Sequence, residues 1–509
     1  MRLLASFISK YLFLAFIFLS VFFIFEKFSY LKLNTADSSI YLSTAENIAH
    51  HKGAVVSYNL CQCFKTLYHP LLPYYQPLYP LFSSLFIDHG GIVKIIKINI
   101  LLFALNVTLI FYIIQRSIPT SFNVIFIYIL AFSFNFFISA LYPWTEQFHF
   151  FCFICSFILF LKFKDHPGHL FWLGILNGIF MLVRVAHMFN FLAYIPVLFI
   201  GNASFRQKLR RAAFFVGGFI LAYGLYQIFC LSAYHVFYPE YARPGASYGF
   251  AHIFNGIIYN PDKVGIQLAV GSFFTLNNFL RIAGHIRDFY LLMPLFLWPA
   301  VFYYFLPIHK RVDGGLVELC ISQSLFIILG YSVMFYWSVD FHEAFRYSLI
   351  PYVLISVAGW YCLYQGLSLS DSWGKKIIGG LMLLSLLYPQ VNKLILFQSE
   401  LSKRPMWERP FYKDLMESYH WIDNNLPKEI LVASDEEQEG YFMHRPYISL
   451  PPGESYNCTN LKLFDHIYAP DYYLLSNGVS DQCFTGISYV QIFTNDTFRV
   501  LEVKRKKRV

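Results

Sequence analysis

Charged residues are scarce in this sequence: they make up 14% of its 509 residues, against roughly 25% in soluble proteins. Hydrophobic residues reach 57%, too many for a water-soluble fold to bury. A soluble enzyme, a disordered chain and a collagen-like fibre are therefore excluded. Cysteine is also scarce, and nine cysteines do not make a disulfide scaffold in a chain of this length. Neither a P-loop nor a dinucleotide-binding glycine motif occurs.

Long apolar runs fill most of residues 1–398. A helix needs about 20 mostly apolar residues to cross a bilayer, so these runs predict an α-helical polytopic membrane protein with about eleven transmembrane helices. The first run has no signal-peptide cleavage site and is read as a retained span. The fifth and sixth are separated only by RVAHM and form either a hairpin or one broken helix. The runs are Tyr11–Phe25 (extending back toward Leu3), Ile95–Ile114, Phe122–Leu141, Phe148–Phe163, Leu170–Val183, Phe189–Ile200, Ala212–Leu231, Phe289–Leu306, Leu316–Trp337, Tyr347–Tyr364 and Ile377–Phe397.

Lysine and arginine residues lie at alternate ends of these runs, and they account for the net charge of +9 without a nucleic-acid partner. Cytoplasmic connections carry most of the positive charge in membrane proteins. The pattern therefore predicts a cytoplasmic N-terminus and outward loops at residues 26–94 and 232–288. The basic positions are Arg2, Lys10, Arg116, Lys162, Lys164, Ser204–Arg211, His309–Arg311, Lys375 and Lys376.

Residues 404–509 have a mixed polar composition and predict a small extracytoplasmic α/β domain. An amphipathic helix should end at Asn425–Pro427. The segments EILVAS, DYYLLS and FRVLEV read as strands. Cys458 and Cys483 lie in this domain, where a disulfide between them can persist.

Polar groups gather where the predicted spans meet the outward side. Asp37 begins a predicted helix that contains Tyr41. It is either only an N-cap or a carboxylate that also serves as a general base, since the two roles are compatible. Tyr74 and Tyr79 belong to YYQPLYPLF, which predicts an interfacial helix or a simple membrane anchor. Glu146, in LYPWTEQFHF, is either a surface residue that complements the helix dipole or a functional acid.

Two further segments carry charge at the same boundary. Arg184 follows GILNGIFMLV, in which Gly174 and Gly178 allow close helix packing; this arginine is either snorkelling or functional. The later segment SVDFHEAFRYSLIPY contains His342, Glu343 and Arg346. Glu343 and Arg346 can pair with each other, and an arginine can also bind a phosphate. His342 does not lie in a recognisable metal-binding pattern.

In order along the chain, ADSSIYLSTAENIA, QPLYPLF, TEQF, GILNGIFMLVR, HEAFRYSLIP and WIDNNLPKEILVASDE resemble the GT-C superfamily of polytopic glycosyltransferases. The resemblance is strongest to bacterial relatives of the protein O-mannosyltransferases and aminoarabinose transferases, which use polyprenyl-phosphate sugars. It extends over nearly the whole chain. It implies a GT-C-like transmembrane catalytic region over residues 1–398, followed by the extracytoplasmic domain.

The resemblance also implies roles for individual residues. Asp37 matches the catalytic carboxylate of the first outward loop, and Glu146 matches a second acid. Arg184 and Arg346 match family arginines that would bind the donor phosphate. A possible substrate groove is formed by Tyr41, Tyr74, Tyr79, His342 and Glu343. Two departures stand out: Arg184 is followed by valine instead of proline, and Asp37-Ser-Ser replaces a tandem acidic pair. Because paired carboxylates are what a divalent ion prefers, such a metal is not indicated, although metal dependence stays open; no other cofactor is implied.

The expected activity is inverting transfer of a sugar from a polyprenyl-phosphate donor to an acceptor hydroxyl, with Asp37 as base. The acceptor is a glycan, a lipid or a protein. The expected location is the bacterial inner membrane with an outward-facing site, or the endoplasmic reticulum membrane with a lumenal site in a eukaryote. Two alternatives remain: a polysaccharide polymerase or ligase that uses a lipid-linked glycan, and a membrane transporter. A transporter is disfavoured because the polar groups gather at one face of the membrane and no internal repeat is seen.

Overall fold

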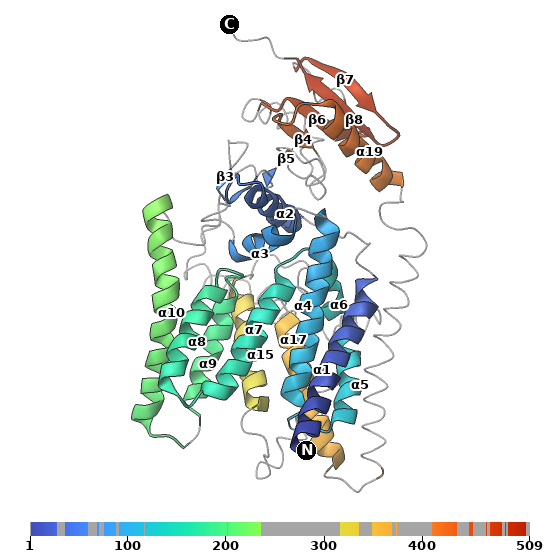
Figure 1. The fold of residues 1–509 in the computed structure, drawn as a ribbon. Coiled ribbons are helices and arrows are strands. Elements are labelled where there is room, and N and C mark those ends of the chain that lie inside the picture. Colours follow the sequence, from blue (N-terminus) through green and yellow to red (C-terminus); the bar gives the residue numbers. More distant parts are fainter. Residues whose placement is uncertain are drawn as a thin grey trace.

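The structure of the protein is a computed structural model. It describes residues 2–27, 36–56, 58–59, 69–70, 76–87, 91–116, 118–200, 202–235, 316–334, 349–368, 373, 410–434, 447–450, 465, 469–480, 484 and 487–504. A bundle of long helices carries a small α/β domain at one end, and the N-terminus lies at the opposite end (Figure 1). The described residues are therefore predominantly helical and include a small sheet, as predicted.

Most of the predicted apolar runs in the described part of the chain form helices. Three of these helices are long and apolar enough to cross a membrane: Ile92–Ile114, Glu146–Phe163 and Phe205–Ala233. The runs 289–306 and 377–397 lie outside the described residues, so the number of spans stays a prediction. The helices are α1 (Arg2–Glu26), α2 (Ala36–Ala49), α3 (Leu78–Ile87), α4 (Gly91–Ile114), α5 (Thr120–Ala131), α6 (Phe134–Leu141), α7 (Glu146–Phe163), α8 (Pro167–Phe180), α9 (His187–Leu198), α10 (Phe205–Tyr234), α15 (Leu316–Met334), α17 (Leu349–Ser368) and α19 (Pro410–Asn425).

One predicted span is not a single continuous helix. The run Phe122–Leu141 is divided between α5 and α6, because Ser133 has an extended backbone (φ −64°, ψ 127°) between them. Hydropathy measures how apolar a segment is and does not detect such a break. In contrast, the two short runs around RVAHM are resolved as a hairpin: α8 and α9 are joined by a turn over residues 181–186.

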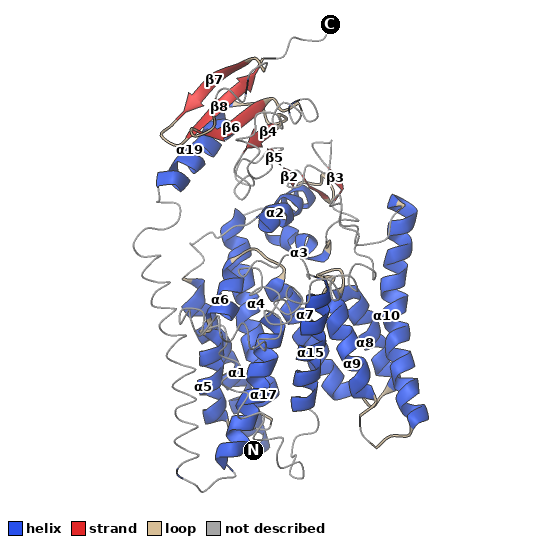
Figure 2. Cartoon of the chain, turned by 180° about the vertical axis from the view of Figure 1, so that it is seen from behind, coloured by secondary structure: helices blue, strands red, loops and turns tan. Residues whose placement is uncertain are grey.

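Helices α8 and α10 pack backbone against backbone, as the glycines predicted. A methyl group at Gly174 would collide with the carbonyl oxygen of Phe215, and one at Gly178 would lie 2.9 Å from the Ala222 Cβ. Gly218 of α10 is equally close to the carbonyl oxygen of Phe171. The rest of α10 stands at the edge of the bundle with apolar side chains exposed, which is typical of a lipid-facing helix (Figure 2).

The adjacent glycines of α10 give a matched test of this packing. We expect Gly218→Ala to lower the stability of the protein by about 1–3 kcal/mol, because the new methyl group meets backbone that cannot move aside. Gly217→Ala should be neutral or slightly stabilising, since nothing lies within 4 Å of its methyl position. Thermal unfolding in detergent measures both variants, and equal behaviour of the two would contradict the close packing.

The terminal domain is a six-stranded sheet with the strand order β2-β5-β4-β6-β8-β7. Strands β2, β5, β4 and β6 are parallel, whereas β8 is antiparallel to both β6 and β7. The predicted helix and the three predicted strands are confirmed as α19, β4, β6 and β8. The strands are β1 (Val55–Val56), β2 (Tyr58–Asn59), β3 (His69–Pro70), β4 (Val432–Ser434), β5 (Tyr447–Ser449), β6 (Tyr472–Ser476), β7 (Tyr489–Thr494) and β8 (Phe498–Val503).

Part of the segment between α1 and α3 is built into this domain. Strand β2 pairs with β5, with Tyr58 opposite Tyr447. A strand close to the N-terminal end of the chain therefore joins a sheet whose other strands lie in the terminal domain. Helix α2 lies between the bundle and the sheet (Figure 1). Its Ile40 is buried in the apolar core of the terminal domain, while Leu42 and Ala45 are buried in the core of the bundle. Helix α2 therefore belongs to both parts of the molecule.

Candidate functional site

Helix α2 is fixed to the bundle through two tyrosines. The Tyr41 hydroxyl donates to Gln76 Oε1 at 2.9 Å, and the Tyr41 and Tyr79 rings meet edge to face at 5.6 Å. Asn99 of α4 donates from Nδ2 both to the Tyr79 hydroxyl (3.2 Å) and to the carbonyl oxygen of Tyr142 (2.7 Å). These contacts join α2, α3, α4 and the segment that precedes α7.

A buried ion pair lies where α7 begins. Arg184 Nη1 is 2.7 Å from Glu146 Oε1 and 3.5 Å from Thr145 Oγ1. Glu146 is 2% exposed and Arg184 is 9% exposed. The alternatives of a surface glutamate and a snorkelling arginine are therefore wrong. The two residues are far apart in sequence, and each provides the opposite charge that the other needs when it is removed from water.

The turn that carries Arg184 is also tied to α3. The backbone N–H of Leu78 donates to the carbonyl oxygen of Leu182 at 3.1 Å. Because Tyr79 follows Leu78 and contacts Tyr41, a continuous set of contacts runs from α2 through α3 to the arginine. The predicted site residues Tyr41, Tyr79, Glu146 and Arg184 are thus gathered at one end of the bundle, below the terminal domain.

The remaining predicted site residues are less defined. Asp37 lies in the first turn of α2, one helical turn before Tyr41. Tyr74 and the trio His342, Glu343 and Arg346 lie outside the described residues. Their predicted roles, and that of Asp37, stay predictions. Within the described ranges, no three side chains of His, Cys, Asp or Glu are grouped as a metal site would require.

Sequence reasoning missed a second polar layer beside the ion pair. His149 Nε2 lies 3.2 Å from His187 Nδ1, and both rings are buried. His187 also contacts Asn177, and Asn190 lies against both imidazoles. The available signal was spacing: His149 follows Glu146 by three residues, and His187 follows Arg184 by three. Polar residues one helical turn apart in apolar helices share a face and are costly in a bilayer.

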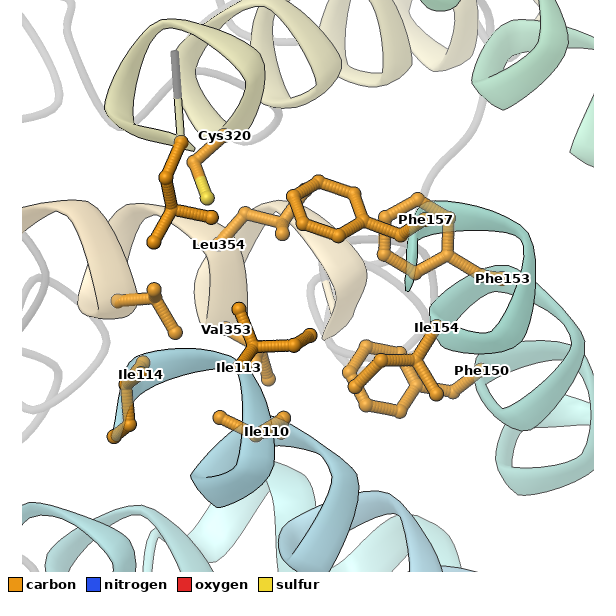
Figure 3. Close-up of a pocket in the computed structure, with 12 residues that line it drawn as sticks. Ile110, Ile113, Ile114, Phe150, Phe153, Ile154, Phe157, Cys320, Val353 and Leu354 are labelled. Atoms are coloured by element: carbon orange, nitrogen blue, oxygen red, sulfur yellow. The ribbon is translucent and has the colours of Figure 1, made fainter. Parts of the chain in front are cut away.

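Farther into the bundle, α4, α7, α15 and α17 enclose a small cavity of about 20 Å³ (Figure 3). Side chains such as Ile110, Phe153 and Leu354 point into it, and no polar side chain lines it. An apolar space of this size stays dry and cannot recognise a sugar. Among the described residues, the buried charged side chains are Glu146 and Arg184, which lie at the end of the bundle near α2.

The fold is shared with solved membrane glycosyltransferases. ArnT from Cupriavidus metallidurans, solved with undecaprenyl phosphate, aligns with a TM-score of 0.55 and 11% identity over 96% of this chain and 97% of its own. The oligosaccharyltransferase AglB from Archaeoglobus fulgidus, in complex with an inhibitory peptide and a dolichol-phosphate, aligns at 0.53 and 12% identity over 90% of this chain and 69% of its own. The mycobacterial arabinofuranosyltransferase AftD aligns at 0.50 and 12% identity, and the match covers 96% of this chain but only 40% of AftD.

Neither the sequence-family models nor the curated proteins contain a match to this chain. At identities of 11–12%, the similarity to solved structures is a similarity of fold. That similarity extends along almost the full length of both ArnT and this chain. The predicted resemblance to the GT-C glycosyltransferases is therefore confirmed at the level of the fold.

Proposed function

We propose that this protein is a membrane glycosyltransferase that moves a sugar from a polyprenyl-phosphate donor to an acceptor hydroxyl. The observation that carries the proposal is the buried Glu146–Arg184 pair, placed under α2 at the domain end of a bundle with the ArnT fold. ArnT was solved with undecaprenyl phosphate and AglB with a dolichol-phosphate, so two proteins of this fold bind lipid phosphates. The active side is the side of the terminal domain, which the lysine and arginine distribution predicts to be extracytoplasmic.

The proposed reaction needs a base and a cation. Asp37 accepts the proton of the acceptor hydroxyl as its oxygen attacks the anomeric carbon, and the configuration of that carbon is inverted. The bond to the donor phosphate breaks, and Arg184 and Arg346 stabilise the negative charge on the phosphate that leaves. Glu146 holds the Arg184 guanidinium at a fixed position before the donor arrives. The residues proposed to form the substrate groove are Tyr41, Tyr74, Tyr79, His342 and Glu343.

The activity is tested by comparing the cell-envelope glycans of cells with and without the protein by mass spectrometry. We expect one sugar to disappear from one attachment point when the protein is removed, which would also identify the acceptor. A shortened polymer with unchanged side groups would instead indicate a polymerase or ligase. Unchanged glycans, with accumulation of a small molecule on one side of the membrane, would indicate a transporter and contradict the proposal.

Arg346 provides a test of donor binding. We expect Arg346→Ala to weaken binding of undecaprenyl phosphate by about 10- to 100-fold, because one charge-assisted contact to the phosphate is lost. Arg116→Ala is the matched control, since Arg116 follows α4 at the opposite end of the bundle and contacts Tyr112. Titration of the detergent-solubilised protein with undecaprenyl phosphate measures both. Equal affinity in the wild type and in Arg346→Ala would remove Arg346 from the donor site.

A further inference from the structure

A chain of buried amide and imidazole groups runs beside the Glu146–Arg184 pair. It passes from Ser156 of α7 through Asn177 of α8 to His187 at the start of α9, and ends at His149 of α7. Ser156, Asn177 and His187 are completely buried, and His149 is 3% exposed. Polar groups at such positions in a membrane bundle are expensive and therefore call for a function.

The Asn177 amide sets the direction of the hydrogen bonds around it. Asn177 Nδ2 donates to the carbonyl oxygen of Leu173 at 2.7 Å, which leaves Asn177 Oδ1 as the acceptor for Ser156 Oγ (3.1 Å) and His187 Nε2 (2.9 Å). His187 therefore carries its proton on Nε2 and presents an unprotonated Nδ1. That nitrogen lies 3.2 Å from His149 Nε2 and 3.3 Å from Asn190 Nδ2, so it can accept a hydrogen bond from either neighbour. The orientation of the Asn177 amide thus determines the tautomer of His187.

This series of buried polar side chains is connected to Arg184 through the backbone. The backbone N–H of His187 donates to the carbonyl oxygen of Arg184 at 2.9 Å. On α7, His149 lies one turn beyond Glu146. The two contacts Glu146–Arg184 and His149–His187 therefore connect α7 to the α8–α9 hairpin at successive levels, 2.7 Å and 3.2 Å between the paired atoms.

The turn over residues 181–186 needs this support. Its backbone bonds are mostly short-range, such as Leu182 N–H to Ile179 O (2.9 Å) and Val183 N–H to Phe180 O (3.0 Å), and it is not part of α8 or α9. Short-range bonds of this kind have poorer geometry than those of an α-helix. Apolar packing alone is non-directional, whereas a hydrogen bond fixes both distance and angle.

We infer that His149 and His187 are positioning residues for Arg184. They hold the turn so that the guanidinium meets Glu146 and, if the proposed function is correct, the donor phosphate. The histidines act through the arginine and touch no substrate. The histidines hold the turn whatever the activity of the protein is, whereas their effect on donor binding rests on the proposed function.

Three variants and one matched control distinguish a role of the histidines in positioning the turn from a general effect on the stability of the protein. His187→Leu removes the ring contacts with Asn177, His149 and Asn190. His149→Leu removes the contacts with His187 and Asn190 but leaves the His187–Asn177 bond. His187→Asn places an amide group where Nδ1 lies, and because an amide can donate or accept, it keeps a polar contact with His149. Gln147→Leu is the control: Gln147 is equally buried on α7 but bonds Ser139 at 2.7 Å, on α6.

Hydrogen–deuterium exchange of the full-length protein in detergent reports the position of the turn without any ligand. We expect amides of residues 181–186 to exchange about tenfold faster or more in His187→Leu and His149→Leu, and within about threefold of wild type in His187→Asn. Gln147→Leu should leave exchange at this turn unchanged even if it lowers the melting temperature. Unchanged exchange in both leucine variants, or equal acceleration in Gln147→Leu, would overturn the inference.

Titration of the same proteins with undecaprenyl phosphate tests the link to the donor. His187→Leu should weaken binding about tenfold, and His187→Asn should restore it to within about threefold of wild type. If the wild type does not bind this lipid, the proposed function fails, while the exchange data still decide whether the histidines hold the turn. If the wild type binds and His187→Leu binds equally well, the arginine does not need this support and the inference fails alone.

Discussion

Asp37→Asn should reduce the rate of sugar transfer by about 10²–10⁴-fold while the protein still inserts and folds. The amide has nearly the shape of the carboxylate but cannot accept the proton of an attacking hydroxyl. Asp37 lies in the first turn of α2, whose Tyr41 is joined to Tyr79 and through α3 to the Arg184 turn. A base at this point would lie at the same end of the bundle as Arg184, the cation proposed to stabilise the leaving phosphate.

Transfer from a polyprenyl-phosphate sugar, followed by mass spectrometry of the product, measures the effect. Binding of undecaprenyl phosphate should remain within a few-fold of wild type, because the proposed role of Asp37 concerns the acceptor. Glu46→Gln is the control, since it makes the same change of acid to amide on the same helix, outside the proposed site. Retained turnover in Asp37→Asn would exclude Asp37 as the base.

Arg184→Leu should lower the stability of the protein by about 3–5 kcal/mol, because it leaves the Glu146 carboxylate buried without the guanidinium. The double variant Glu146→Leu/Arg184→Leu should recover most of that loss, since two apolar side chains can replace a buried ion pair. Neither variant should transfer sugar. Stability that recovers while activity does not is the result expected if the pair serves catalysis and not only folding.

Chemical denaturation in detergent, combined with the transfer assay, gives both quantities. The pair Arg211–Asp165 is the comparison: its atoms are 3.0 Å apart, but the Asp165 side chain is 63% exposed. Arg211→Leu should therefore cost less than about 1 kcal/mol. Recovery of activity in the Glu146→Leu/Arg184→Leu double variant would show that the pair is structural.

Local features of this fold were predictable from the sequence because they depend on neighbouring residues. Apolar runs identify helices such as α4 and α7, and alternating or apolar segments identify β4, β6 and β8. The break at Ser133 was not predictable, since its flanking residues are as apolar as those within α5 and α6. Strand β2 has only two residues, too few for a pattern, and its partner lies almost four hundred residues later.

The candidate site was predicted as a set of residues but not as a geometry. Glu146 and Arg184 were each identified as charges at a membrane boundary, and their resemblance to family motifs supported both. That they form a pair depends on how α7 meets the α8–α9 turn, which no local pattern encodes. His149 and His187 were missed because each is a single polar residue in an apolar segment, and their significance appears only when the two rings are 3.2 Å apart.

The shared burial of α2 has a consequence for biosynthesis. Ile40 is synthesised among the first residues, but most of the apolar core to which it belongs, including Leu415 and Tyr419, is translated close to the end. In a nascent or truncated polypeptide, α2 thus lacks its packing partners in the terminal domain, and strand β2 lacks its partner strand β5. The end of the molecule around α2 is therefore completed only when the last part of the chain has been synthesised, and we expect a prematurely terminated chain to lack the proposed site in its finished form.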